Sequence, residues 1–369
     1  MGKDDRSAHS RAGIAASGGE VRALTGLRGI AACYVVLYHM QQDMPGDGVV
    51  PTFIRHGYLA VDLFFVLSGY VMAMVHGRDT FDLAGYGLFL RKRFARIYPL
   101  YAAVTVATLL LVDVWGSAPI TPPRLLVNIL LLQGWGAGAT IVAPAWSLSA
   151  EVGAYLIFPL LVPMLLTGRR APALACATLA LLLLAAISLG GPQPRSGPLD
   201  LYQPHIVTPL LRAVAGFTLG LAAYRLGRSR IVAHWLTRPW SAAALGCAIL
   251  LLLVWPATDL AVVVLFVPFL VALAFGRTGV ASRILAAPLP HRLGVLSFSI
   301  YLVHFPIRET LRPWLADRLA GLGVPHAYEM ATVGACLATL AMAALTYRLI
   351  ERPGRSMLLS QPRFPQTVS

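Results

Sequence analysis

Charged residues are scarce in this chain. Asp, Glu, Lys and Arg make up 12% of its 369 residues, whereas about 25% is usual for soluble domains. Hydrophobic residues make up 57%, and no polar stretch outside the two ends is long enough to fold alone. The sequence therefore excludes an ordinary soluble domain and predicts an all-α integral membrane protein formed by a single helical bundle.

Several sequence signatures are also missing. There is no G-x-S-x-G nucleophile elbow, no P-loop and no H-E-x-x-H zinc motif. The four cysteines lie scattered in apolar segments without metal-ligand spacing; they are Cys33, Cys176, Cys247 and Cys336. We therefore expect no metal site and interpret the cysteines as packing residues. No apolar core precedes Val21, so no cleavable signal peptide is expected.

Apolar segments of spanning length recur along the chain and predict a bundle of about ten transmembrane helices. They are residues 24–42, 57–76, 97–114, 146–166, 172–189, 207–226, 240–256, 259–275, 293–311 and 328–349. A shorter apolar piece, Leu125 to Gln133, is predicted to be re-entrant or interfacial. Residues 21–353 then form one transmembrane domain between a flexible tail, 1–20, and a C-terminal tail, 354–369.

Basic residues are unevenly distributed between the two sides of this predicted bundle. Of the 30 Lys and Arg residues, 22 fall on the side of the N-terminus and 6 on the opposite side, with Arg28 and Arg212 inside the membrane. Because positive residues are retained in the cytoplasm, both tails are expected there, in a multi-pass protein of the plasma (inner) membrane. This topology also explains the net charge of +14, so nucleic-acid binding is excluded.

The first apolar segment, from Leu24 to Met40, carries two ionisable residues. Arg28 and His39 are eleven residues apart, so they share one helix face at a separation of roughly 16 Å. Such groups are costly in a bilayer unless they face a polar interior, which the other helices are expected to supply. The alternative is that Arg28 snorkels to the headgroups. Asp43 lies four residues after His39 and either braces the imidazole or is a helix-end charge.

The next two segments carry charges of opposite sign. Asp62 lies in an apolar run and is expected to pair with an arginine of another helix, Arg28 being a candidate, or to act directly on substrate. Arg93 and Arg96 are three residues apart and therefore neighbours on one helix face. They are either an ordinary cytoplasmic basic cluster or a phosphate site for an anionic substrate.

The fourth segment places Ser147, Glu151 and Tyr155 on one polar stripe, because they recur every four residues. We expect Glu151 at the membrane depth of His39, where the carboxylate would orient the imidazole as an acid/base pair. The alternative is that Glu151 complements the dipole at the start of its helix.

The ninth segment has a similar stripe of Ser297, Tyr301, His304 and Arg308. For His304, a structural hydrogen bond and a substrate contact remain equal alternatives.

Six stretches together resemble membrane-bound acyltransferase family 3. They occur in the family's order between Leu24 and Pro353: LTGLRGIAACYVVLYH, GYLAVDLFFVLSGYVM, FLRKRFARIYPLY, AWSLSAEVGAYLIFPLL, LGVLSFSIYLVHFPI and YRLIERP. The resemblance implies a ten-helix bundle that transfers an acyl group, most often acetyl, from cytoplasmic acyl-CoA to a hydroxyl. The implied acceptors are extracytoplasmic carbohydrates such as surface polysaccharides and lipid-linked sugars. Some members carry an additional SGNH-type esterase domain, which is not expected here.

The resemblance also implies roles for five residues. Arg28 and His39 match the arginine–histidine pair of the family's first helix. Arg93 and Arg96 match its cytoplasmic R-x-x-R, and Glu151 matches the glutamate of its W-S-L-S-x-E segment. Acyl-CoA, a substrate and not a permanently bound cofactor, is expected to place its phosphates on the R-x-x-R pair and its pantetheine arm along Arg28. His39 is then the general base, or the site of a covalent acyl intermediate.

Four further residues are interpreted as substrate contacts, namely Asp62, Ser147, Tyr301 and His304. The alternative to an enzyme is a transporter or flippase of an anionic or lipid-linked substrate, whose polar stripes would line a pathway. Dependence on CoA discriminates between the two. No residue pattern identifies the acceptor, the acyl chain length, the oligomeric state or any partner enzyme.

Overall fold

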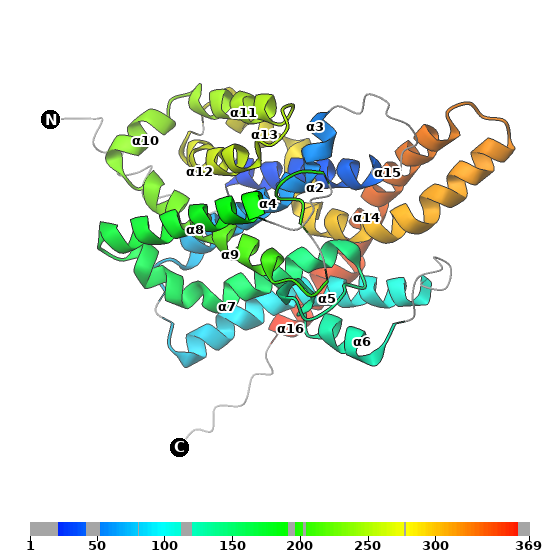
Figure 1. The fold of residues 1–369 in the computed structure, drawn as a ribbon, viewed down its shortest axis with the longest axis horizontal. Coiled ribbons are helices and arrows are strands. Elements are labelled where there is room, and N and C mark those ends of the chain that lie inside the picture. Colours follow the sequence, from blue (N-terminus) through cyan, green and yellow to red (C-terminus); the bar gives the residue numbers. More distant parts are fainter. Residues whose placement is uncertain are drawn as a thin grey trace, which may run out of the picture.

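The computed structural model describes residues 21–41, 52–79, 81–111, 120–190, 196–201, 204–276 and 278–360. Within these ranges every regular element is a helix and none is a strand, which confirms the all-α prediction. In chain order the elements are α2 (Arg22–Gln41), α3 (Thr52–Arg55), η1 (His56–Tyr58), α4 (Leu59–His76), α5 (Leu83–Leu111), α6 (Pro122–Ile129), η2 (Gln133–Trp135), η3 (Ala143–Ala145), α7 (Trp146–Leu166), α8 (Arg170–Gly190), α9 (Thr208–Gly227), α10 (Arg230–Leu236), α11 (Ser241–Leu252), α12 (Asp259–Phe275), α13 (Val280–Leu285), α14 (Pro288–Gly321), α15 (Ala327–Thr346), η4 (Tyr347–Glu351) and α16 (Arg352–Leu359) (Figure 1).

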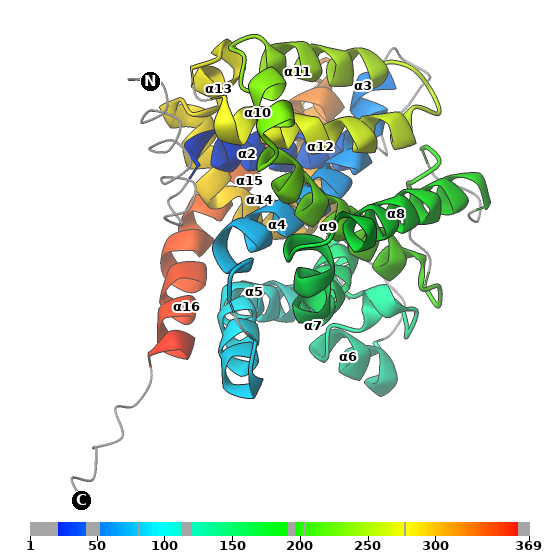
Figure 2. The ribbon, with the colours of Figure 1, turned by 90° about the vertical axis from the view of Figure 1, so that its left-hand side faces the viewer.

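The predicted tail 1–20 and the residues Asp43 and 361–369 lie outside the described residues. The C-terminal tail was predicted to begin at residue 354, but α16 is helical through Leu359. Figure 2 shows α16 running beside α5, and the Arg91 guanidinium donates a hydrogen bond of 2.7 Å to the carbonyl of Leu358. The start of this predicted tail is therefore part of the helical assembly.

Six helical stretches of the described chain are long and apolar enough to span a membrane. They are Arg22–Gln41, Thr52–His76, Leu83–Leu111, Ala143–Leu166, Arg170–Gly190 and Ala327–Leu359. Helices α10 and α11, bent by 74° relative to each other, add a seventh if the pair counts as one span. The other predicted spans are helices too, but α12 has only 17 residues, and arginines and histidines lower the hydropathy of α9 and α14. Ten spans therefore stay a prediction.

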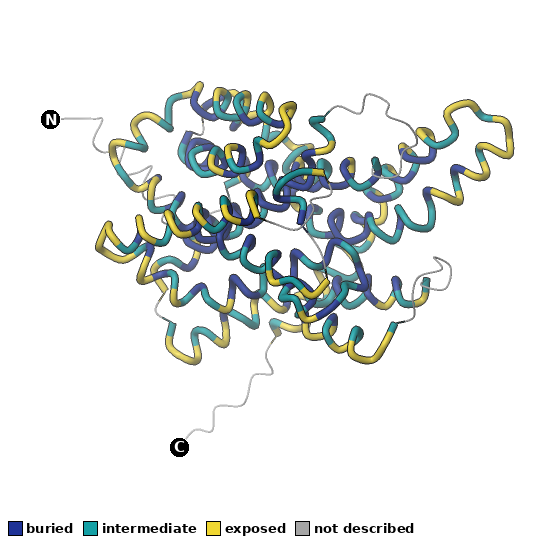
Figure 3. Tube along the Cα trace, in the orientation of Figure 1, coloured by how far each residue is buried: buried dark blue, intermediate teal, exposed yellow. Residues whose placement is uncertain are grey.

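Large apolar side chains cover the outside of the assembly. On α8, four leucines are between 61% and 90% exposed: Leu174, Leu179, Leu182 and Leu189. The buried residues are concentrated in the centre of the bundle, and the peripheral helices carry the exposed ones (Figure 3). Soluble monomers rarely expose contiguous apolar surface on this scale. The outer surface is that of a membrane protein, in agreement with the prediction from composition.

Two helix crossings in the centre bring backbones into contact at glycines. A Cβ atom on Gly220 of α9 would lie 2.0 Å from the carbonyl oxygen of Val66 on α4, and one on Gly69 would meet Phe217 equally closely. At the second crossing, a Cβ atom on Gly294 of α14 would lie 1.8 Å from the carbonyl oxygen of Thr25 on α2. Small residues at such crossings let membrane helices approach closely. They hold α2, α4, α9 and α14 together around the site.

The short apolar piece between α5 and α7 does not span the bundle. It contains α6, an eight-residue helix of which only Asn128 is buried. The Asn128 amide donates hydrogen bonds to the carbonyls of Arg124 and Ala139, at 2.8 and 2.9 Å, and accepts one from the Ile141 amide. This side chain thereby organises an irregular segment that leads into α7.

Candidate active site

A cavity lies between helices α2, α4, α5, α7 and α14. Its empty volume is about 860 Å³, including the part open to solvent. Its charged lining residues are Arg28 from α2, Arg93 and Arg96 from α5, and Glu151 from α7. The structure thus brings together four of the five residues to which the resemblance assigns roles.

The rest of the cavity wall is mostly apolar. These lining residues are Val61, Phe64, Phe65, Leu67, Val71, Met72, Ile97, Leu148 and Phe298. A wall of this kind lowers the local dielectric constant and strengthens the attraction between an arginine and an anion. Arg93 Nε is buried and has no hydrogen-bond partner among the described residues. A buried cationic donor without a partner is costly, and an anionic ligand would satisfy it.

Glu151 lies among these arginines and not beside His39. Its Oε1 accepts hydrogen bonds from Ser68 Oγ and from Tyr155 Oη, both at 2.5 Å. The predicted pairing of Glu151 with His39 is therefore not observed, and their depth in the membrane stays a prediction. Ala145, just before α7, is fully buried, so α7 begins among packed residues inside the bundle.

Ser147 and Tyr301 form a polar part of the cavity wall. Their hydroxyl oxygens are 2.6 Å apart, and the Tyr301 hydroxyl also donates to the carbonyl of Pro144 at 2.9 Å. The aromatic ring of Tyr301 lies 6.0 Å from the ring of His304, measured between centroids. Tyr301 therefore links the cavity to the two histidines beyond it.

His39 and His304 form a pair near the end of α2. Their ring centroids are 5.0 Å apart. His39 Nδ1 lies 3.0 Å from the carbonyl oxygen of Val35, which can only accept, so the neutral ring carries its proton on Nδ1 and its basic lone pair on Nε2. His304 is fully buried, and neither of its ring nitrogens has a hydrogen-bond partner among the described residues. Neither histidine lines the cavity described above.

Two arginines of α14 hold the end of α2. Arg308 Nε donates to the carbonyl of His39 at 2.9 Å, and Arg312 Nη1 donates to that of Met40 at 2.6 Å. The last carbonyls of a helix have no partner within the helix, and cations near them are favourable. The backbone that carries the His39 imidazole is thereby fixed against α14.

Asp62 makes a buried ion pair with Arg212 of α9. Each side chain is 1% exposed, and the contacts are Nε–Oδ1 at 2.7 Å and Nη2–Oδ2 at 2.5 Å. The Arg212 guanidinium also lies 5.6 Å from the ring centroid of Trp146. Arg28, the partner suggested from sequence, instead donates to Ser297 Oγ at 3.5 Å. The suggested pairing is wrong because the α4–α9 crossing, which the sequence does not reveal, places Arg212 next to Asp62.

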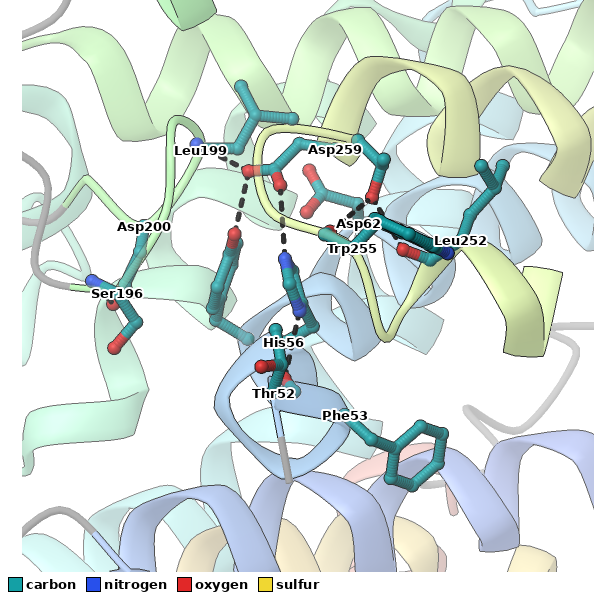
Figure 4. A network of polar contacts seen from close by, with 12 residues as sticks. Thr52, Phe53, His56, Asp62, Ser196, Leu199, Asp200, Leu252, Trp255 and Asp259 are labelled. Atoms are coloured by element: carbon teal, nitrogen blue, oxygen red, sulfur yellow. Dashed lines mark hydrogen bonds and ion pairs between the residues drawn. The ribbon is translucent and has the colours of Figure 1, made fainter. Parts of the chain in front are cut away.

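The sequence interpretation missed a polar network beyond this pair (Figure 4). Asp259, at the start of α12 and fully buried, accepts hydrogen bonds on Oδ2 from Tyr58 Oη at 2.7 Å and from the Leu199 amide at 2.8 Å. His56 Nε2 lies 3.9 Å from Asp259 Oδ1. The sequence feature that could have revealed this network is Asp259, a carboxylate at the start of the apolar segment 259–275. The network ties the segment before α9 to η1 and α12.

Glu351 was also missed, although it belongs to the closing YRLIERP stretch. It lies in η4, which is a π-helical turn, and its Oε2 accepts a hydrogen bond of 2.6 Å from Ser299 Oγ on α14. Turns of this type occur frequently at functional sites.

Comparison with known proteins identifies the family of this chain. The family model described as "Acyltransferase domain" matches residues 21–349. Because the match covers most of the chain, the protein belongs to acyltransferase family 3.

Among its relatives, acyltransferase MdmB of Streptomyces mycarofaciens is 30% identical over 91% of this chain and 92% of that protein. A Bacillus subtilis protein, YrhL, named provisionally as a peptidoglycan O-acetyltransferase, is 23% identical over 91% of this chain and 55% of its own. Protein 2 in the picA locus of Rhizobium radiobacter is 34% identical over 35% of this chain and 75% of that protein. No solved structure matches the chain significantly.

Proposed function

We propose that this protein is a membrane-bound O-acyltransferase that uses cytoplasmic acyl-CoA, in the simplest case acetyl-CoA. Its acceptor would be a hydroxyl of an extracytoplasmic carbohydrate or lipid-linked sugar. The observation that carries the proposal is that Arg28, Arg93 and Arg96 all line the same cavity. Guanidinium groups bind phosphate oxygens through paired, charge-assisted hydrogen bonds, and the donor has three phosphates to offer.

The donor would lie along one line through the bundle. Arg93 and Arg96 hold its phosphates at the side of the α4–α5 turn, which the distribution of basic residues assigns to the cytoplasm. The pantetheine arm follows the cavity past Arg28 toward Tyr301. From there, His304 and His39 lead to the end of α2.

In this mechanism His39 is the general base. Its Nε2 removes the proton of the acceptor hydroxyl, and the hydroxyl oxygen attacks the thioester carbonyl. The tetrahedral intermediate collapses by breaking the carbon–sulfur bond, and the imidazolium returns the proton to the departing thiolate of CoA. The Tyr301 and Ser147 hydroxyls are candidate donors to the oxyanion. An acyl-histidine intermediate would use the same residues.

Glu151 takes a different role from the one expected from sequence. As a cavity carboxylate bonded to Ser68 and Tyr155, it offsets the charge of the arginines and fixes the wall beside them. Asp62 acts through its ion pair with Arg212 and not as a substrate contact.

Membership of an acyltransferase family favours the enzyme over a transporter or flippase. The provisional name of YrhL, a peptidoglycan O-acetyltransferase, supports a carbohydrate acceptor.

The test uses inverted membrane vesicles from cells that produce the protein, supplied with radiolabelled acetyl-CoA. We expect label to enter the envelope fraction with wild-type protein and to fall by about 100-fold or more with His39→Ala, because a general base contributes about 10²–10⁴-fold. The matched control is His234→Ala, which removes an exposed histidine of α10. Normal transfer by the His39 variant would refute the assignment, and absence of CoA dependence would favour transport.

A further inference from the structure

A second hollow lies outside the cavity described above, where α4 ends and α5 begins. Its empty volume is about 690 Å³, including the part open to solvent, and it shares no lining residue with the arginine cavity. Its lining residues are His76, Arg78, Asp79, Phe81, Gly85, Leu88, Phe89 and Lys92. The same distribution of basic residues assigns this turn to the cytoplasmic side.

The hollow and the arginine cavity follow each other along α4 and α5. On α4, Met72 lines the cavity and His76 lines the hollow; on α5, Arg93 lines the cavity and Phe89 the hollow. Each pair is four residues apart, which is about 6 Å along a helix. The Arg93 guanidinium lies 5.8 Å from the centroid of the Phe89 ring. The two spaces are therefore about one helical turn apart, a separation that one elongated ligand is long enough to bridge.

The inner wall of the hollow is aromatic and rigid. Phe89 is 3% exposed and stacks on Phe158 with centroids 5.3 Å apart and planes at 24°. Phe81 packs edge-on against both rings, at 5.6 and 5.5 Å. Phe89 is thus covered by its neighbours, and the partly exposed Phe81 ring is the one available to contact the face of a nucleic-acid base, an interaction that does not depend on which base it is.

The rim of the hollow has two cations available to an anion. Arg78 and Lys92 are exposed and make no hydrogen bond or ion pair with another described residue. The facing carboxylate of Asp79 is already bonded to His76 Nδ1 at 2.7 Å. The Asp82 carboxylate, next to the hollow, accepts the Gly85 amide at 2.7 Å. The rim therefore favours a phosphate over a neutral group.

We propose that this hollow binds the adenosine 3′-phosphate end of the acyl-CoA donor, which rests on the proposed function. The purine lies against Phe81, which packs on Phe89, and the 3′-phosphate lies between Arg78 and Lys92. The diphosphate reaches Arg93 and Arg96, one helical turn deeper. The donor carries its groups in the order adenosine 3′-phosphate, diphosphate and pantetheine. Along α4 and α5, the hollow, the two arginines and the cavity then follow in the same order.

The test compares two donors that differ only in the 3′-phosphate. We measure the Kd of acetyl-CoA and of 3′-dephospho-acetyl-CoA for full-length protein in nanodiscs, without an acceptor. Wild-type protein is expected to bind acetyl-CoA about tenfold more tightly, since a charge-assisted contact contributes on this scale. The double variant Arg78→Ala, Lys92→Ala should bind both donors with the wild-type affinity for the dephospho form.

A matched control is Arg169→Ala, Arg170→Ala, which removes two charges from the α7–α8 connection, predicted to lie on the same side of the membrane. This control should keep the tenfold preference. Equal affinity of wild-type protein for the two donors, or an unchanged preference in the Arg78, Lys92 variant, would overturn the inference. Failure of wild-type protein to bind either donor would instead overturn the proposed function.

Discussion

Two side chains from different helices, Asp62 and Arg212, neutralise each other in the core of the bundle. Their bidentate contact satisfies both charged groups where neither can reach water. Removing one partner leaves the other buried and uncompensated, which usually costs more than the pair contributes.

We therefore predict that Asp62→Ala destabilises the folded protein by about 3–5 kcal/mol, because it leaves the Arg212 guanidinium without its carboxylate. Replacing both residues by apolar ones, Asp62→Leu with Arg212→Met, should restore most of this loss. Reversible unfolding of the purified protein in detergent measures both effects. A single variant as stable as wild type, or a double variant no better than the single one, would show that the pair is not what stabilises this region.

Single residues also show what sequence can and cannot predict. Arg28, Arg93, Arg96 and Glu151 could be selected from the sequence because charges in apolar segments are conspicuous. Their neighbours could not be assigned, because helical periodicity gives the face on which a residue lies and not the helix that packs against that face. For that reason Arg212 was overlooked as the partner of Asp62.

Among the elements, the glycine crossing of α4 and α9 positions the ion pair and one wall of the cavity. Its two glycines lie against the backbone of the opposite helix. The space for any side chain is already occupied by main-chain atoms, which cannot rotate away as a flexible side chain can.

We predict that Gly220→Ala lowers the stability by about 1–3 kcal/mol, the usual cost of overpacking, because its Cβ would lie 2.0 Å from the Val66 carbonyl oxygen. The control is Gly87→Ala on α5, where no heavy atom lies within 4 Å of the new Cβ. That change should be neutral or stabilising, since alanine favours helices. Thermal unfolding of both variants would decide, and equal melting temperatures would contradict the packing argument.

The start of α7 also explains why Glu151 contacts Ser68 and Tyr155 and not His39. Hydropathy predicted the start of α7 correctly, because the predicted span and the helix both begin at Trp146. Hydropathy did not show that the segment before α7 is buried in the bundle. An irregular buried segment with few charges has the same hydropathy as a loop at the membrane interface. An estimate of depth based on helix ends therefore fails where a helix begins in the interior.

For the whole molecule, composition was sufficient to predict an all-helical membrane protein. It was not sufficient for the number of spans, because functional helices such as α14 carry polar stripes that reduce their hydropathy. On the other helices that line the cavity, the charges leave enough apolar sequence for recognition as spans.

The topology gives a prediction at this scale. If the ten predicted spans place 22 basic residues on one side and 6 on the other, protease tags at both termini should be cut in inside-out vesicles and protected in right-side-out ones. A periplasmic reporter fused at residue 369 should correspondingly be inactive. Cleavage of only one terminal tag in the inside-out vesicles would require an odd number of spans and a different assignment of the cytoplasmic side.

The hydrogen bond between Ser147 and Tyr301 has a consequence for the membrane as a whole. It lies in the cavity wall on the side of the two histidines, where a seal against bulk water is needed if donor and acceptor approach from opposite sides of the membrane. A bundle that delivers an acyl group across a bilayer without such a barrier would short-circuit the electrochemical gradient of the cell. In the proposed mechanism, this pair of hydroxyls is therefore the point at which the bundle must stay closed to protons and ions.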